Sequence, residues 1–151
     1  DVNAFNLANP LIGLSKNRLL FVQTHKTDPE DIWSDFPKWA QKKIREDKIR
    51  VLALDTVKIA REVSSRSDLL QRMQGIVLLG IFLKSTPFLK KSGISEKQLM
   101  KGVEKSIRKY FGKRGEQVVQ DNLNAVKRGF TEVFEIQRNV IETNMKKGFI
   151  A

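Results

Sequence analysis

Two short apolar runs, separated by an amphipathic stretch, constrain the fold of this chain more than any other feature of its sequence. The runs lie within residues 18–23 and residues 49–54. A run that is apolar on both faces is typical of a strand covered by helices on each side. Between them, residues 30–46 place apolar side chains at helical spacing. A strand, a crossover helix and a second strand normally leave the two strands parallel, so this segment predicts part of a layered α/β sheet.

The crossover stretch carries one face of large apolar residues. Ile32, Phe36, Trp39 and Ile44 fall on roughly one side of a helix, with basic residues opposite. Pro37 interrupts the stretch, and we expect it at the first turn of a second helical segment, where its missing N–H costs nothing.

Both tryptophans of the chain, Trp33 and Trp39, lie in this stretch. Their proximity suggests a stacking platform for bases. Their helical context favours packing in a core or a domain interface instead.

A further strand is expected over residues 2–7, because Asn9 precedes Pro10 and is pushed out of the helical region. After Asp55 the pattern becomes helical throughout. The expected helices cover residues 56–63, residues 67–84, residues 96–111 and a long final stretch from about Gly115 that includes Val133 and extends through Val140 and Ile141.

Two local motifs support these helices. Ser95 followed by Gln98 has the spacing of a capping box, with apolar residues at helical intervals behind it. Two glycines around two basic residues, Gly112 to Gly115, favour a turn between the last two helices.

These elements together predict an α/β fold: a three-layer α/β/α domain with a small, mostly parallel sheet and a helical C-terminal half. We expect the domain to cover residues 1–136 and residues 137–151 to form a helical extension or linker. No internal repeat and no low-complexity segment is recognisable.

The residue types exclude several kinds of site. The chain has no cysteine, so it cannot form a disulfide, use a cysteine nucleophile or hold an iron–sulfur cluster by itself. The single histidine, His25, has no carboxylate or serine beside it in a recognisable motif, and we interpret it as an ordinary loop residue. No glycine loop of the Walker or dinucleotide-binding type follows a strand. We therefore assign no catalytic residue, and any cofactor-binding residues remain unknown.

A cluster of acidic residues could suggest a metal site. Asp28, Glu30, Asp31 and Asp35 lack the central glycine of an EF-hand loop, and they precede and open a helix. Acidic side chains at a helix start complement the positive end of its dipole. We interpret them as capping residues and assign no metal ligand.

The strongest compositional signal is a net charge of +11. It suits nucleic acid, an anionic membrane, an acidic protein or a phosphorylated cofactor. A single nucleic-acid stripe would concentrate its basic residues on one face, and dispersal over every element disfavours it. The basic pairs are Lys42-Lys43, Lys90-Lys91, Arg108-Lys109, Lys113-Arg114, Lys127-Arg128 and Lys146-Lys147.

The longest apolar stretch, residues 75–83, is about half the ~20 residues that a membrane-spanning helix needs, and Lys84 follows it. We expect a core helix and no membrane partner. No charged segment followed by an apolar one marks the start of the sequence for secretion, so a cytoplasmic location is expected.

Three stretches carry a resemblance. Residues 51–60, VLALDTVKIA, look like a strand that ends in an aspartate, followed by a helix with a Lys-Ile-Ala segment. Residues 77–84, VLLGIFLK, are similar to an apolar helix with a glycine and a following lysine. Residues 110–119 contain an aromatic, glycine, lysine, glycine turn, and residues 122–126, NLNAV, resemble an asparagine-rich helix.

Through these stretches, residues 35–136 resemble the gamma domain of pyruvate:ferredoxin oxidoreductases and related 2-oxoacid oxidoreductases. The resemblance implies a gamma domain or subunit fragment of an enzyme that decarboxylates a 2-oxoacid oxidatively. The whole enzyme would use thiamine diphosphate, iron–sulfur clusters and coenzyme A, and would pass electrons to ferredoxin or flavodoxin. Its partners would be the other domains or subunits of the oxidoreductase.

Physical reasoning gives the same residues scaffold roles. Asp55 ends a strand and can cap the next helix, while Gly80 lets another element approach closely. In the family, a glycine-rich loop contributes to coenzyme A contacts, and this sequence has no counterpart of it. The chain is therefore expected to bind none of these cofactors alone and to be a non-catalytic part of the enzyme. A basic nucleic-acid-binding or scaffold domain without catalysis is the alternative.

Overall fold

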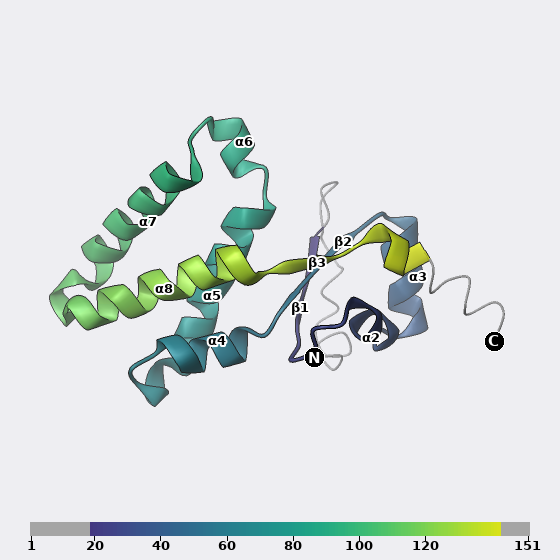
Figure 1. The fold of residues 1–151 in the computed structure, drawn as a ribbon, viewed down its shortest axis with the longest axis horizontal. Coiled ribbons are helices and arrows are strands. Elements are labelled where there is room, and N and C mark those ends of the chain that lie inside the picture. The colour runs from purple at the N-terminus through teal and green to yellow at the C-terminus, as the bar shows by residue number, and fades with distance from the viewer. Residues whose placement is uncertain (1–18, 143–151) are drawn as a thin grey trace. The chain divides into compact units, whose positions relative to one another are not determined.

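The computed structural model describes residues 19–142, which fall into two compact units (Figure 1). The first unit contains the described residues up to Asp55 together with those from Phe134 onward, and the second is Thr56–Val133. The strand expected over residues 2–7 lies outside the described residues.

A small mixed sheet forms the centre of the first unit. Strand β1 (Leu19–Gln23) pairs in parallel with β2 (Arg50–Leu54), and β2 pairs in antiparallel fashion with β3 (Phe134–Ile136). The strand order is β1-β2-β3. The predicted strand, crossover and parallel strand are therefore confirmed, as is the α/β class.

Two short helices make the crossover. Helix α2 (Pro29–Ser34) ends before Pro37, and α3 (Lys38–Glu46) begins after it, with Pro37 at the N-cap. The core of this unit is formed by Leu20, Val22, Ile32, Trp33, Phe36, Ala40, Ile44, Ile49, Val51, Ala53, Ile136 and Ile141.

Of the two tryptophans, only Trp33 lies in the core, so placing Trp39 on the buried face of the crossover was wrong. Trp33 is fully buried, with its ring edge-on to Phe36 at 5.4 Å between centroids, whereas Trp39 is 46% exposed. The break at Pro37 resets the helical phase, so α3 buries Ala40 and Ile44, and the adjacent Trp39 points off that face.

The end of the chain also departs from the expected long helix. The last helix of the second unit ends at Glu132, Val133 is extended (φ −59°, ψ 139°), and Phe134–Ile136 joins the sheet. Residues 138–142 are helical again, and Ile141 is fully buried in the core of the first unit. The proposed boundary at residue 136, with residues 137–151 as an extension, remains a prediction.

The second unit contains helices and no strand over its described residues, as expected from the sequence. Its elements are α4 (Thr56–Val63), the short 3₁₀ turn η1 (Ser67–Leu69), α5 (Leu70–Ser85), α6 (Phe88–Ser92), α7 (Glu96–Phe111), the 3₁₀ turn η2 (Gly112–Arg114) and α8 (Glu116–Glu132). The predicted capping box starts α7: the Ser95 hydroxyl accepts from the Gln98 N–H at 3.1 Å, and the Gln98 side chain accepts from the Ser95 N–H at 2.9 Å.

Helices α5 and α8 pack with almost no space between their backbones. A methyl group at Gly80 would lie 2.1 Å from the carbonyl oxygen of Val126, and one at Gly129 would lie 2.2 Å from that of Val77. The close approach predicted at Gly80 is thus confirmed, and Gly129 makes its counterpart on α8. Helix α7 lies on the same unit through a second cluster that includes Ile107, Val119, Leu123 and Val126.

No helix within residues 19–142 is long and apolar enough to cross a membrane.

Candidate functional site

The histidine and the acidic residues considered above do not form a catalytic or metal-binding site among the described residues. His25 is exposed in the segment after β1. Asp28 caps α2, because its carboxylate accepts from the N–H of Glu30 at 3.0 Å, which confirms the capping interpretation for this residue. Asp35 pairs with Lys26 at 2.5 Å, and that hydrogen bond raises the pKa of Lys26. The described residues contain no group of three metal-binding side chains.

One polar pair lies where ligands commonly bind in parallel sheets, at the carboxyl ends of the strands. Gln23 is the last residue of β1 and donates from its side chain to the carboxylate of Asp55, directly after β2, at 2.9 Å. The N–H of Thr24 also donates to the carbonyl of Leu54 at 3.2 Å. The aspartate in the first resembling stretch therefore joins the ends of the two parallel strands.

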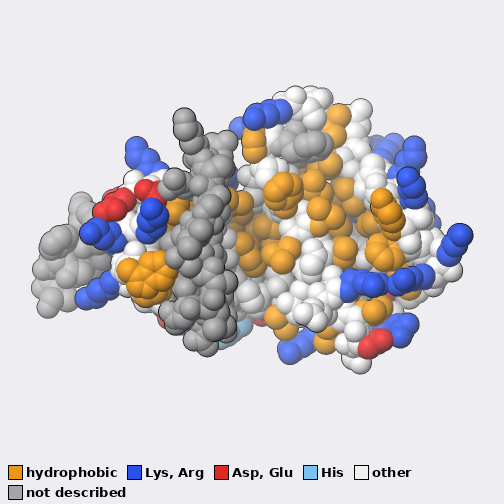
Figure 2. Space-filling view, turned by 180° about the vertical axis from the view of Figure 1, so that it is seen from behind, with side chains coloured by type: hydrophobic (Ala, Val, Ile, Leu, Met, Phe, Trp, Pro, Cys, Tyr) orange, Lys and Arg blue, Asp and Glu red, His pale blue; other side chains and the backbone are white. Residues whose placement is uncertain are grey.

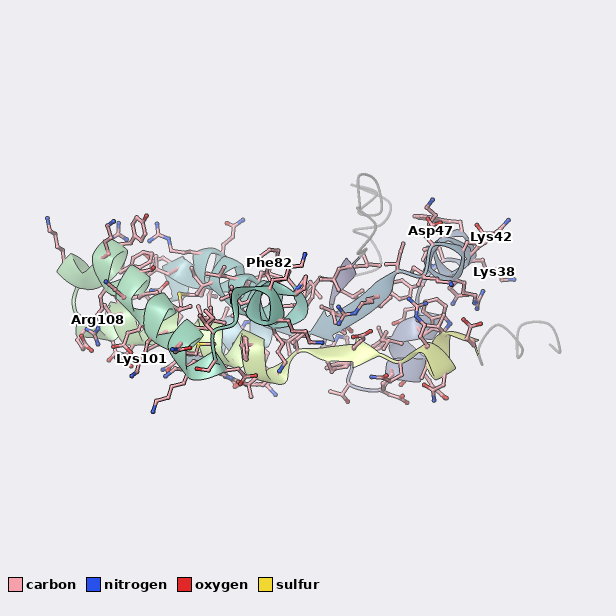
Figure 3. The ribbon with its side chains drawn as sticks, turned by 90° about the horizontal axis from the view of Figure 1, so that it is seen from above. Lys38, Lys42, Asp47, Phe82, Lys101 and Arg108 are labelled. Atoms are coloured by element: carbon pink, nitrogen blue, oxygen red, sulfur yellow. The ribbon has the colours of Figure 1, made fainter. Side chains whose placement is uncertain are left out.

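A row of lysines follows the exposed face of α7. Lys97, Lys101, Lys105 and Lys109 are spaced four residues apart and are all exposed. Figure 3 labels Lys101 among them. Among the residues that the structure describes, none of the four forms an ion pair. Like charges four residues apart destabilise a helix by about 0.2–0.5 kcal/mol per pair, so this row is not there to stabilise α7. We call these four residues the lysine row.

The nearby carboxylates are already occupied by another side chain. Arg108 donates to Glu116 at 2.7 and 2.9 Å and to Glu104 at 3.1 Å. These hydrogen bonds lower the pKa of Glu116 to about 2 and raise that of Arg108. Glu96, at the start of α7, lies 3.7 Å from Lys84 of α5. The lysine row therefore keeps its positive charge unneutralised by the acidic residues of its own helix.

A buried carboxylate on α8 links two parts of the second unit. Asp121 of α8 is 7% exposed and accepts from the N–H of Ser65 at 3.1 Å, from its hydroxyl at 2.7 Å and from Gln117 at 2.7 Å. Ser65 lies in the connection between α4 and η1. The carboxylate thus fixes that connection to α8.

Sequence reasoning did not single out Asp121 or the lysine row. The available signal for Asp121 was a charged residue among closely spaced apolar ones, between Val119 and Leu123. For the lysine row it was the strict four-residue spacing within the expected helix. Neither pattern identifies a special residue until the structure shows that Asp121 is buried and that the carboxylates of α7 pair with other side chains.

The residues present do not fit an iron–sulfur cluster, because the chain has no cysteine to ligate one. The lysine row has the charge that phosphates require.

The chain is similar to one family along most of its length. The family model for pyruvate ferredoxin/flavodoxin oxidoreductase matches residues 2–132. A pyruvate-flavodoxin oxidoreductase of Trichormus variabilis is 27% identical over 106 residues, which cover 70% of this chain and 8% of that protein. A putative pyruvate-flavodoxin oxidoreductase of Synechocystis sp. is 22% identical over 119 residues, or 78% of this chain and 9% of that protein. The chain thus spans less than a tenth of the length of these curated relatives.

Proposed function

Since the chain belongs to the pyruvate ferredoxin/flavodoxin oxidoreductase family, we propose that it is the gamma-type domain, or part of it, of a 2-oxoacid:ferredoxin or flavodoxin oxidoreductase. The whole enzyme then carries out the coenzyme A-dependent oxidative decarboxylation of a pyruvate-type 2-oxoacid. The observation that carries this proposal is the family match over residues 2–132.

In this proposal the chain is a non-catalytic part of the enzyme. Thiamine diphosphate and the iron–sulfur clusters belong to other domains or subunits, which is supported by a chain that has no cysteine. In the same proposal, ferredoxin or flavodoxin is the electron carrier of the whole enzyme. A cytoplasmic location remains a prediction.

The residues of this chain supply a rigid support and a positive surface. The contact between Gly80 and Val126 and the hydrogen bonds of Asp121 fix α4, α5 and α8 as one body. This body holds α7 so that its lysine row faces away from the core. The unneutralised charge there attracts an acidic surface of a neighbouring domain, or the phosphates of coenzyme A brought by a neighbouring segment.

The test uses the protein purified with the domains or subunits that accompany it. We expect reduction of flavodoxin, ferredoxin or a viologen dye to depend on both a 2-oxoacid and coenzyme A. Omitting coenzyme A is the control for non-specific dye reduction. A preparation that contains thiamine diphosphate and clusters but oxidises no 2-oxoacid would exclude the proposal.

A nucleic-acid-binding domain is the competing function, and the lysine row is the observation that favours it. Binding to phosphate backbones weakens steeply as salt rises through about 50 to 200 mM. Titration of the protein with duplex and single-stranded oligonucleotides over this range separates the two functions. Absence of binding at the lowest salt removes the alternative.

A further inference from the structure

Helix α5 has an apolar side that the chain does not bury. One side of the helix packs inside the second unit through Met73, Val77, Gly80 and Ile81. On another side, Leu78, Leu79 and Phe82 are 41%, 43% and 57% exposed. Figure 2, seen from the side on which α8 does not cover α5, shows hydrophobic side chains gathered over the second unit.

The composition of α5 is that of a fully enclosed helix. It contains no acidic residue, and its apolar side chains are spread around the whole circumference. A helix that is hydrophobic all round is normally buried on every side. Three large apolar side chains on adjacent turns exceed the single exposed residues that are ordinary on protein surfaces.

Gly75 adds an independent observation on the same side. Gly80 and Gly129 are glycines because a neighbouring backbone leaves no room for a side chain. Gly75 lies inside α5 with no atom within 4 Å of the position a Cβ would occupy. Glycine is a poor helix former, so the chain alone gives no reason for it here. Leu78 and Phe82, three and seven residues further on, share its side of the helix.

We infer that Gly75, Leu78, Leu79 and Phe82 form a docking face for an apolar surface of another domain of the oxidoreductase polypeptide, which approaches most closely over Gly75. This inference rests on the proposed function. The length of the curated relatives is the argument for this occupant. This chain corresponds to only 8% and 9% of their lengths, so most of such a polypeptide lies outside it.

Charge distinguishes this occupant from a second copy of the chain. Arg72 of α5 is exposed and forms no ion pair among the described residues, whereas Lys84 lies 3.7 Å from Glu96. The helix has no carboxylate of its own, and the whole chain carries +11. Two copies docked through this face would bring like charges together. The partner surface is therefore apolar at its centre and carries a carboxylate at its rim, opposite Arg72.

The experiment places a photo-reactive benzoylphenylalanine at position 82 of the complete, assembled oxidoreductase. This residue keeps an aromatic ring at Phe82, where the native ring is exposed (Figure 3). We expect illumination to cross-link α5 to another domain, and mass spectrometry of the cross-linked peptides to identify it. The matched control is the same substitution at Tyr110, which is 75% exposed on α7 and should give at least tenfold less of that product.

A second pair of measurements uses Gly75→Leu. In the 151-residue chain alone the substitution should leave the thermal midpoint unchanged or raised, because the site is open and leucine favours helix. In the complete enzyme it should lower the yield of the assembled form at least tenfold.

The outcomes separate the two proposals. An enzyme without 2-oxoacid activity contradicts the proposed function. An active enzyme overturns the docking inference if position 82 gives no cross-link, or if it cross-links to a second copy or to residues 1–55 of its own chain. Unchanged assembly with Gly75→Leu would overturn it as well.

Discussion

Gly80 of α5 lies directly against the backbone of Val126 in α8, so that a Cβ at Gly80 would meet the Val126 carbonyl oxygen at 2.1 Å and the carbonyl carbon at 2.9 Å. A side chain could rotate away from such a collision, but a helical backbone cannot. The packing of the second unit therefore depends on two glycines, Gly80 and Gly129, in stretches that are otherwise ordinary helix.

Gly80→Ala should destabilise the protein by at least about 2 kcal/mol, because the added methyl group forces α5 and α8 apart. The control is Gly75→Ala in the same helix, where no atom lies within 4 Å of the new methyl group. That variant should gain up to about 1 kcal/mol from helix propensity. Urea unfolding of both variants measures the difference, and equal stabilities would contradict the close approach.

The sequence was sufficient where local pattern and tertiary structure agree. The parallel pair β1 and β2, the four longer helices of the second unit and the capping box at Ser95 were predicted, because short apolar runs and capping residues act over a few neighbouring positions. The short helix α6 was not predicted. Gly80 was predicted to allow a close approach, but its partner was not. Identifying Val126 requires knowing which helix crosses α5.

The predictions from sequence failed where contacts between residues distant in the sequence determine the structure. Phe134–Ile136 continues the helical apolar pattern of α8, yet it pairs with β2 about eighty residues earlier, and β-propensity depends strongly on such pairing. Trp39 was placed on the buried face because the phase break at Pro37 was not carried through to the helix that follows. The lysine row became a candidate only when the carboxylates around it were seen to bind Arg108.

Gly115→Ala should destabilise the turn between α7 and α8. Gly115 has φ 107° and ψ 159°, a conformation essentially restricted to glycine, and a residue with a Cβ there costs about 1–3 kcal/mol. Gly112, in the same turn, has φ −56° and ψ −35° with open space around it, so Gly112→Ala should be neutral or stabilising. Thermal unfolding of the two variants compares them directly, and the reverse order would disprove the assignment of the strained position.

Asp121→Ala should cost about 2–3 kcal/mol, because it removes the acceptor of three hydrogen bonds and leaves the N–H of Ser65 without its partner. Asp121→Asn keeps the shape and one acceptor oxygen, and it should recover part of that loss. The control is Asp68→Ala, which removes an exposed ion pair with Arg66 at 2.7 Å and should cost less than about 1 kcal/mol. Chemical denaturation ranks the three, and a harmless Asp121→Ala would show that Asp121 does not fix the connection after α4.

The ion pair between Arg108 and Glu116 should make the free energy of unfolding depend on pH below about pH 5. Hydrogen bonds from Arg108 lower the pKa of Glu116 from 4.5 to about 2 in the folded protein. The unfolded chain therefore takes up a proton at this carboxyl before the folded chain does, and the stabilisation is complete above about pH 5 and is lost as pH falls from 4.5 towards 2.

The measurement is the unfolding free energy of the native protein and of Glu116→Gln between pH 7 and about pH 2.5. Their difference should be constant down to about pH 5 and should shrink below it, and added salt should reduce it because both side chains are exposed. Glu142→Gln, at an exposed carboxyl with no ion pair among the described residues, serves as the reference. A difference that stays constant to about pH 3 would mean that Arg108 does not hold the Glu116 carboxylate in solution.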